Sequence, residues 1–68
     1  MTPDKAIDLA AAIVGGKGAL CKALNLNRQA IHNWKRHKIP LTRAIEIEKL
    51  TNFEVTREML RPDFFNGN

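Results

Sequence analysis

The stretch that decides the fold is LCKALNLNRQAIHNW, which runs from Leu20 to Trp34. Its pattern predicts two short helices joined by a turn that is too tight to leave them parallel. Asn25 is expected to end the first helix in the left-handed backbone conformation, which Asn tolerates best after Gly. Asn27 would then cap the second helix. The apolar side chains predicted to lock the pair together are Leu20, Leu24, Leu26, Ile31 and Trp34.

Helix signals flank this stretch on both sides. Thr2–Asp4 is typical of a helix start, and apolar residues at helical spacing follow until Gly15–Gly16. Further helices are predicted over residues 17–24, 28–37 and 41–51, and a short one begins with Thr56 as its cap. No alternation of apolar and polar residues is long enough for a strand. The sequence therefore predicts an all-α, compact five-helix domain over residues 1–65, with a frayed tail at 66–68.

The charges are unevenly distributed along the 68 residues, although the net charge of +4 is modest. The acidic residues all lie near the two ends of the chain. The middle, between Asp8 and Glu46, holds seven bases and no acid: Lys17, Lys22, Arg28, Lys35, Arg36, Lys38 and Arg43. A surface of one sign attracts a polyanion such as DNA, although an ordinary solvated basic face would have the same composition.

Size and composition exclude several other classes. A chain this short buries only about 60% of its unfolded surface, so self-association would help to stabilise it. Cys21 is the only cysteine, which excludes an intrachain disulfide. With only two histidines beside it, no metal site and no cofactor are expected. No apolar run approaches the roughly 18 residues of a membrane span, and the N-terminus does not resemble a signal peptide, so a cytoplasmic location is expected.

The segment resembles the helix-turn-helix of phage Cro proteins and repressors. That family usually has Ala where Cys21 stands and Gly where Asn25 stands, and both departures are mild. Flanking features look like the all-helical Cro and antitoxin-type branch, and the resemblance covers roughly residues 6–65. Those features are Gly15–Gly16, Ile39–Pro40, the stretch RAIEIE from Arg43 to Glu48, and Leu60–Asp63.

The resemblance implies a role for each matching residue. The residues implied to read DNA bases are Arg28, Gln29, His32 and Asn33, although His32 could equally be a solvated surface residue. Arg can bond guanine bidentately, and Gln or Asn can do the same for adenine. The residues implied to contact DNA phosphates are Lys17, Asn27, Lys35, Arg36 and Lys38. Trp34 could stack on a base, but its helical spacing after Ile31 favours the core.

The resulting hypothesis is a Cro-like repressor that binds a pseudo-palindromic double-stranded DNA operator through the major groove as a weak homodimer. The alternative is the DNA-binding antitoxin of a toxin–antitoxin pair. An enzyme is not expected, because the sequence offers no nucleophile beside a base and no phosphate-binding loop. No small-molecule substrate and no membrane partner are expected either.

The C-terminal part supplies the predicted dimer interface. Phe53 and Val55 are expected to form an extended apolar link, and large exposed apolar groups mark partner surfaces. The residues predicted for this interface are Phe53, Val55, Met59 and Phe64, with Phe65 beside them.

Overall fold

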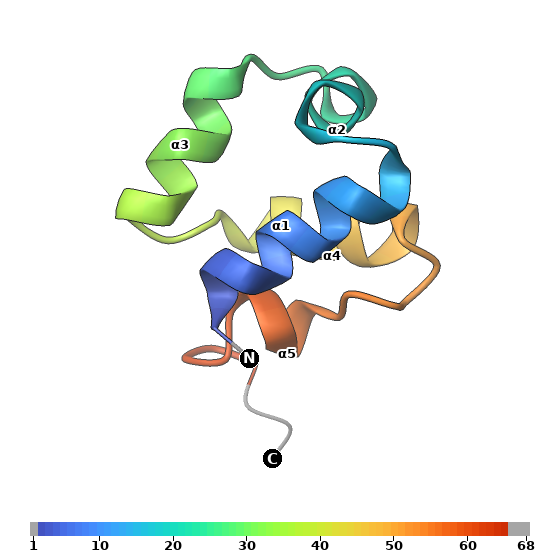
Figure 1. Ribbon diagram of the computed structural model, residues 1–68. Coiled ribbons are helices and arrows are strands. Elements are labelled where there is room, and N and C mark those ends of the chain that lie inside the picture. The colour runs from blue at the N-terminus through green and yellow to red at the C-terminus, as the bar shows by residue number, and fades with distance from the viewer. Residues whose placement is uncertain (1, 66–68) are drawn as a thin grey trace.

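The computed structural model describes residues 2–65, which form five helices and no strand (Figure 1). The helices are α1 (Pro3–Val14), α2 (Lys17–Leu24), α3 (Arg28–Arg36), α4 (Leu41–Leu50) and α5 (Arg57–Leu60). Helix α1 contacts both α2 and α5, while α4 packs against α5 and α2 against α3. The predicted all-α fold is confirmed, and the predicted frayed tail at 66–68 lies outside the described residues.

Local signals set the bounds of α1. The Thr2 hydroxyl accepts a hydrogen bond from the Lys5 amide at 3.3 Å, and Pro3 occupies the first helical position. The helix ends at Gly15, which adopts a φ of 108° that a residue with a Cβ rarely takes. The amide of Gly16 then donates to the Ala11 carbonyl at 2.6 Å, which closes the C-terminal turn.

The helix-turn-helix lies where the sequence predicts it. Asn25 has a φ of 58°, and the next amide, that of Leu26, donates to the Cys21 carbonyl at 2.8 Å. The Asn27 side chain caps α3 by accepting from the Ala30 amide at 3.1 Å. In Figure 1, α2 is seen nearly end-on while α3 runs across the view, so the two axes cross steeply.

One apolar core joins all five helices. Of the side chains predicted to lock α2 to α3, Leu20, Leu24, Ile31 and Trp34 are buried, while Leu26 is half-buried and packs against the core. The buried apolar residues are Ala6, Ile7, Ala10, Ala11, Leu20, Cys21, Leu24, Ile31, Trp34, Ile39, Ala44, Ile47, Val55 and Leu60. Three alanines of α1 are among them, and their small side chains let neighbouring helices approach closely.

The link after α4 is a tight turn, so the prediction of an extended link at Phe53 and Val55 is wrong. Asn52 and Phe53 both have positive φ, at 55° and 67°. This conformation is rare for an aromatic residue. It is held because the buried Thr51 hydroxyl donates to the Ile47 carbonyl at 2.9 Å and accepts from the Val55 amide at 3.1 Å. The turn therefore exposes Phe53 while it inserts Val55 into the core.

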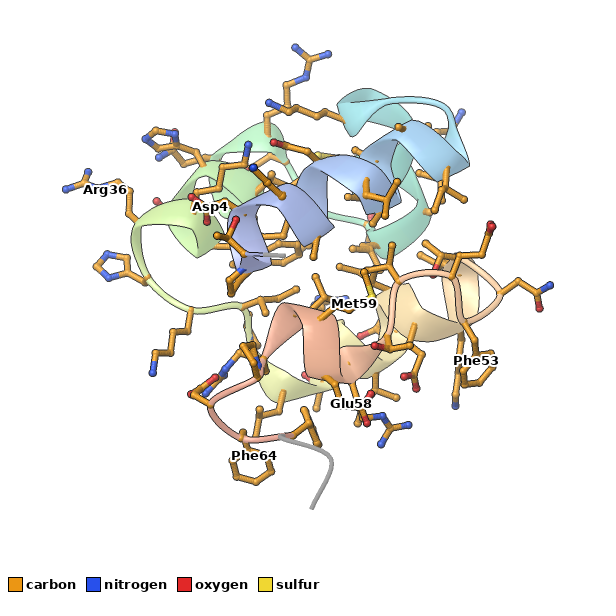
Figure 2. All side chains as sticks on the ribbon, turned by 60° about the horizontal axis from the view of Figure 1, so that its bottom comes forward. Asp4, Arg36, Phe53, Glu58, Met59 and Phe64 are labelled. Atoms are coloured by element: carbon orange, nitrogen blue, oxygen red, sulfur yellow. The ribbon has the colours of Figure 1, made fainter. Side chains whose placement is uncertain are left out.

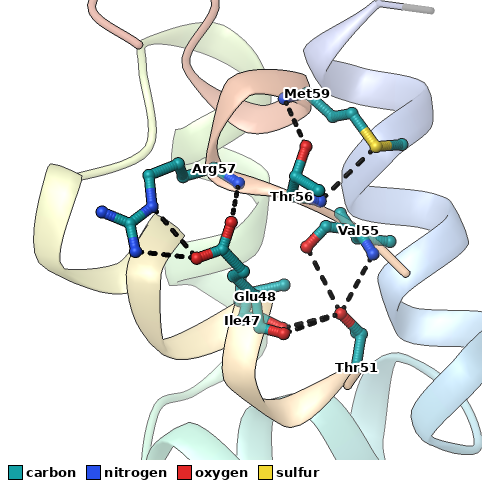
Figure 3. A network of polar contacts seen from close by, with 7 residues as sticks. All are labelled: Ile47, Glu48, Thr51, Val55, Thr56, Arg57 and Met59. Carbon is teal, nitrogen blue, oxygen red and sulfur yellow. Dashed lines mark hydrogen bonds and ion pairs between the residues drawn. The ribbon is translucent and has the colours of Figure 1, made fainter. Parts of the chain in front are cut away.

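A buried carboxylate ties α4 to α5 (Figure 3). Glu48 is only 4% exposed, and it accepts from the Arg57 amide at 2.9 Å and from the guanidinium nitrogens Nε and Nη2 at 3.0 and 2.8 Å. The hydrogen bonds from the Arg57 side chain are the main reason why the pKa of Glu48 is lowered. Glu48 therefore stays charged, and it satisfies an amide in the first turn of α5 that would otherwise lack a partner.

Replacing Glu48→Ala should lower the free energy of unfolding by about 2–3 kcal/mol, because it leaves the Arg57 amide and part of the guanidinium unpaired. The loss should stay below the value for a fully buried pair, since a third of the Arg57 side chain reaches water. Urea denaturation would measure it. Glu46→Ala, in the same helix but with an exposed carboxylate, is the control and should cost no more than about 1 kcal/mol. Equal losses for the two variants would contradict this role of Glu48.

Candidate nucleic-acid interface

Helix α3 separates an apolar inner face from a polar outer face. Ile31 and Trp34 are buried against the rest of the domain, whereas the four predicted base-reading residues are exposed: Arg28, Gln29, His32 and Asn33. Within this set, the Gln29 amide Nε2 donates to Asn33 Oδ1 at 3.2 Å. The two amide side chains are therefore aligned along one strip of the helix, a turn apart. All four predicted readers share one surface.

A second strip of α3 faces the start of α2. Arg28, His32 and Lys35 line a surface hollow of about 310 Å³ together with Ile31 and with Lys17 of α2. The fold thus brings Lys17 beside α3, although it stands eleven positions before Arg28 in the sequence. Lys17 begins a helix whose cap, Gly16, offers no side-chain hydrogen bond. The hollow combines three cationic or ionisable side chains of α3 with the positive end of α2.

Among the predicted phosphate-contacting residues, two lysines are paired within the protein. The Lys35 ammonium lies 2.6 Å from Asp8 of α1, and Lys38 lies 3.0 Å from Asp63. The hydrogen bond from Lys35 is the main cause of the lowered pKa of Asp8, and the same bond raises the pKa of Lys35. Sequence reasoning missed both pairs, because they join segments 27 and 25 residues apart.

The remaining predicted phosphate contacts differ in their surroundings. Arg36 is exposed and projects away from the body of the domain in Figure 2. Asn27 is exposed, and it uses its side-chain oxygen to cap α3. Arg43, another base of the middle block, donates to the Leu24 carbonyl at the end of α2 at 3.2 Å and pairs with Glu46. The basic block is therefore less freely cationic than its composition indicates.

The residues predicted for a dimer interface do not share one environment. Phe53 and Phe64 are 59% and 61% exposed, and Figure 2 shows both projecting outward, with Phe53 at the opposite edge from Arg36. Met59 is half-buried and packs against the core. Val55 has no exposed surface, so its predicted place in an interface is corrected: it is a core residue. Leu50 is a further large apolar residue at the surface, 41% exposed, and it is not among the residues predicted for the interface.

Phe65 is also tied to the domain. The Arg57 guanidinium lies 5.5 Å from the centre of its ring, and the Phe64 ring meets it edge-on at 4.9 Å. The aromatic pair therefore closes the α5 end of the domain on one side and leaves Phe64 exposed on the other.

The fold and the outer face of α3 define an all-helical helix-turn-helix domain of the Cro type. A sequence model described as bacterial toxin YdaS matches residues 7–68, and the chain belongs to this YdaS family. Within residues 2–65, no helix is long and apolar enough to cross a membrane.

Two individual proteins are similar to the chain. YdaS of Escherichia coli (strain K12), named as a candidate transcriptional regulator, is 36% identical over 56 residues. The aligned region covers 79% of this chain and 57% of that relative, so the chain spans little more than half of its length. The solved Cro protein from a candidate prophage element, Xfaso 1, in Xylella fastidiosa strain Ann-1 is 43% identical, with a TM-score of 0.81. That match covers 88% of this chain and 94% of the Cro protein.

Proposed function

We propose that the protein is a sequence-specific DNA-binding transcriptional regulator, a repressor of the Cro type. The observation that carries this proposal is the outer face of α3, on which Arg28, Gln29 and Asn33 are exposed over a buried Ile31 and Trp34. Such a helix fits the major groove, where these side-chain types distinguish guanine from adenine. The names of the two similar proteins, a candidate transcriptional regulator and a Cro protein, support the same function.

The base contacts would come from Arg28 and Gln29 in the first turn of α3 and from Asn33 one turn later, with His32 beside it. The phosphate contacts would come from Lys17 and Asn27 at the starts of α2 and α3 and from Arg36 at the end of α3. Lys35 and Lys38 would contribute phosphate contacts when they leave Asp8 and Asp63. Phosphate contacts fix the register of the protein on DNA without reading its sequence. Their number makes the affinity fall steeply with salt.

The regulator would act as a weak homodimer on a pseudo-palindromic operator, with one recognition helix in each half-site. The half-sites of such dimers lie about 34–36 Å apart, one helical turn of DNA. Phe53 and Phe64 are the exposed aromatics available for the interface, and the half-buried Met59 could contribute its exposed part. Phe53 lies at the opposite edge from Arg36 in Figure 2, so a partner at Phe53 would leave that DNA contact free. Repression would follow when the dimer blocks polymerase at an overlapping promoter.

A second candidate is the DNA-binding antitoxin of a toxin–antitoxin pair. The exposed Phe64 supports it, because an antitoxin needs an apolar surface for its toxin. The description of the family as a bacterial toxin points to a toxin–antitoxin system, but it names the toxin and not the antitoxin. Both candidates share the DNA-binding face. Co-expression with the product of the neighbouring gene separates them, since only the antitoxin would co-purify with that product in a fixed ratio.

Arg28→Ala should weaken operator binding by about 1–3 kcal/mol and relax discrimination at one base pair, because a bidentate base contact is lost. Lys17→Ala is the control. It should weaken binding to the operator and to random duplexes alike, because it removes a phosphate contact. Fluorescence anisotropy with labelled duplexes would measure both. If Arg28→Ala weakened specific and random binding equally, Arg28 would not be a base reader.

Phe53→Ser should weaken dimerisation by about tenfold or more, since a large apolar side chain is removed from the proposed interface. The fold should tolerate the change, because the ring is mostly solvent-exposed. Leu9→Ser, at an exposed apolar position of α1, is the matched control and should leave association unchanged. Sedimentation equilibrium at micromolar concentration would compare them. Equal association of Phe53→Ser and the wild-type protein would exclude Phe53 from the interface.

A further inference from the structure

We propose that Asp8 is a specificity-determining residue: its carboxylate competes with DNA phosphates for the Lys35 ammonium and so limits sequence-independent binding. This inference rests on the proposed DNA-binding function and concerns a residue outside the helix-turn-helix. Asp8 lies on α1, whereas the proposed base and phosphate contacts lie on α2, on the turn that joins it to α3, on α3 and on the connector after α3.

The ion pair of Asp8 and Lys35 lies at the edge of the surface that is proposed to contact DNA phosphates. Lys35 lines the hollow that also contains Lys17, Arg28 and His32, and its ammonium lies 2.6 Å from Asp8 Oδ1. The Lys35 side chain is 26% exposed and that of Asp8 is 51% exposed. A phosphate entering this hollow would therefore meet a lysine that already has an anionic partner, and would also be repelled by the carboxylate itself.

The second lysine pair has a different character. Asp63, the partner of Lys38, also accepts two hydrogen bonds from Arg61, each of 2.9 Å, and Arg61 in turn donates to the Ile39 carbonyl at 2.7 Å. Asp63 therefore holds the C-terminal segment in place whether or not Lys38 is present. Asp8, in contrast, has Lys35 as its hydrogen-bond partner among the side chains of residues 2–65. The charge of Asp8 therefore acts mainly on Lys35, with a weaker interaction with Lys17.

The competition should affect random DNA more than an operator. Sequence-independent binding consists almost entirely of phosphate contacts, so a complex with random DNA draws Lys35 to a phosphate and has to break its ion pair with Asp8. In an operator complex the base contacts of Arg28 and Gln29 fix α3 from its other end, and Lys35 can remain on Asp8. Asp8 thereby lowers the affinity for random sequence and widens the gap between specific and random binding.

Asp8→Asn tests this role, because the amide keeps the size and the acceptor oxygen of Asp8 but removes its charge. The variant should bind a random duplex roughly two- to five-fold more tightly, the range that an exposed ion pair can supply. Operator affinity should change less than twofold. The slope of log K against log salt on random DNA should steepen by about 0.9, because one more phosphate is neutralised. Glu54→Gln, the same charge change in the exposed turn after α4, controls for net charge and should leave both affinities nearly unchanged.

A double variant isolates the route through Lys35. In a Lys35→Gln background, Asp8→Asn should have a much smaller effect on random binding, because only the direct repulsion between carboxylate and phosphate remains to be relieved. Thermal unfolding would verify that each variant is folded. An equal response to Asp8→Asn and Glu54→Gln, or an Asp8→Asn effect that is undiminished in the Lys35→Gln background, would overturn the role of Asp8. If the wild-type protein bound no double-stranded DNA, the proposed function itself would fail and this role with it.

Discussion

The left-handed backbone at Asn25 is the constraint on which the rest of the structure depends. It ends α2 and returns the chain within two residues, so that Leu26 donates to the Cys21 carbonyl and Asn27 caps α3. The steep crossing that results leaves one side of α3 against the core and the other side in solvent. A residue that could not adopt this conformation would end α2 differently and rotate the outer face of α3 away from its present position.

The second constraint is the closure of a very small core. Few apolar residues are available in a chain of 68, so the short helix α5 must be held tightly over α1 and α4. The buried Glu48 does this through the backbone and side chain of Arg57, and the Thr51 hydroxyl fixes the turn that places Val55 inside. The same turn directs Phe53 outward, so a core requirement creates the exposed aromatic proposed for dimerisation.

Local signals explain what the sequence could predict. Capping residues at Thr2, Asn27 and Thr56 and the left-handed Asn25 act within four residues, and they placed the helices to within a residue or two. The core positions of α2 and α3 followed from helical periodicity, as did the outer face with Arg28 and Gln29. Periodicity reports only which side of a helix is apolar, however, and it gave no means of separating the buried Val55 from the exposed Phe53.

The contacts that the sequence could not predict are those between distant segments. Glu48 was grouped with the acids at the chain ends, yet it is buried, and its partner Arg57 lies in the next helix. The pairs of Lys35 with Asp8 and of Lys38 with Asp63 require the fold to be known. These pairs reduce the positive charge that is available to DNA. The seven bases that form one block in the sequence lie on a surface where several of them are already paired with carboxylates.

The proposed function depends on the outer face of α3, because the fold and the charge alone would be compatible with many other small basic proteins. Selection of bound sites from a pool of random double-stranded DNA tests it most directly. The proposed Cro-type function predicts a palindromic consensus with half-sites separated by about one helical turn of DNA. A bound pool that remained random in sequence would contradict it.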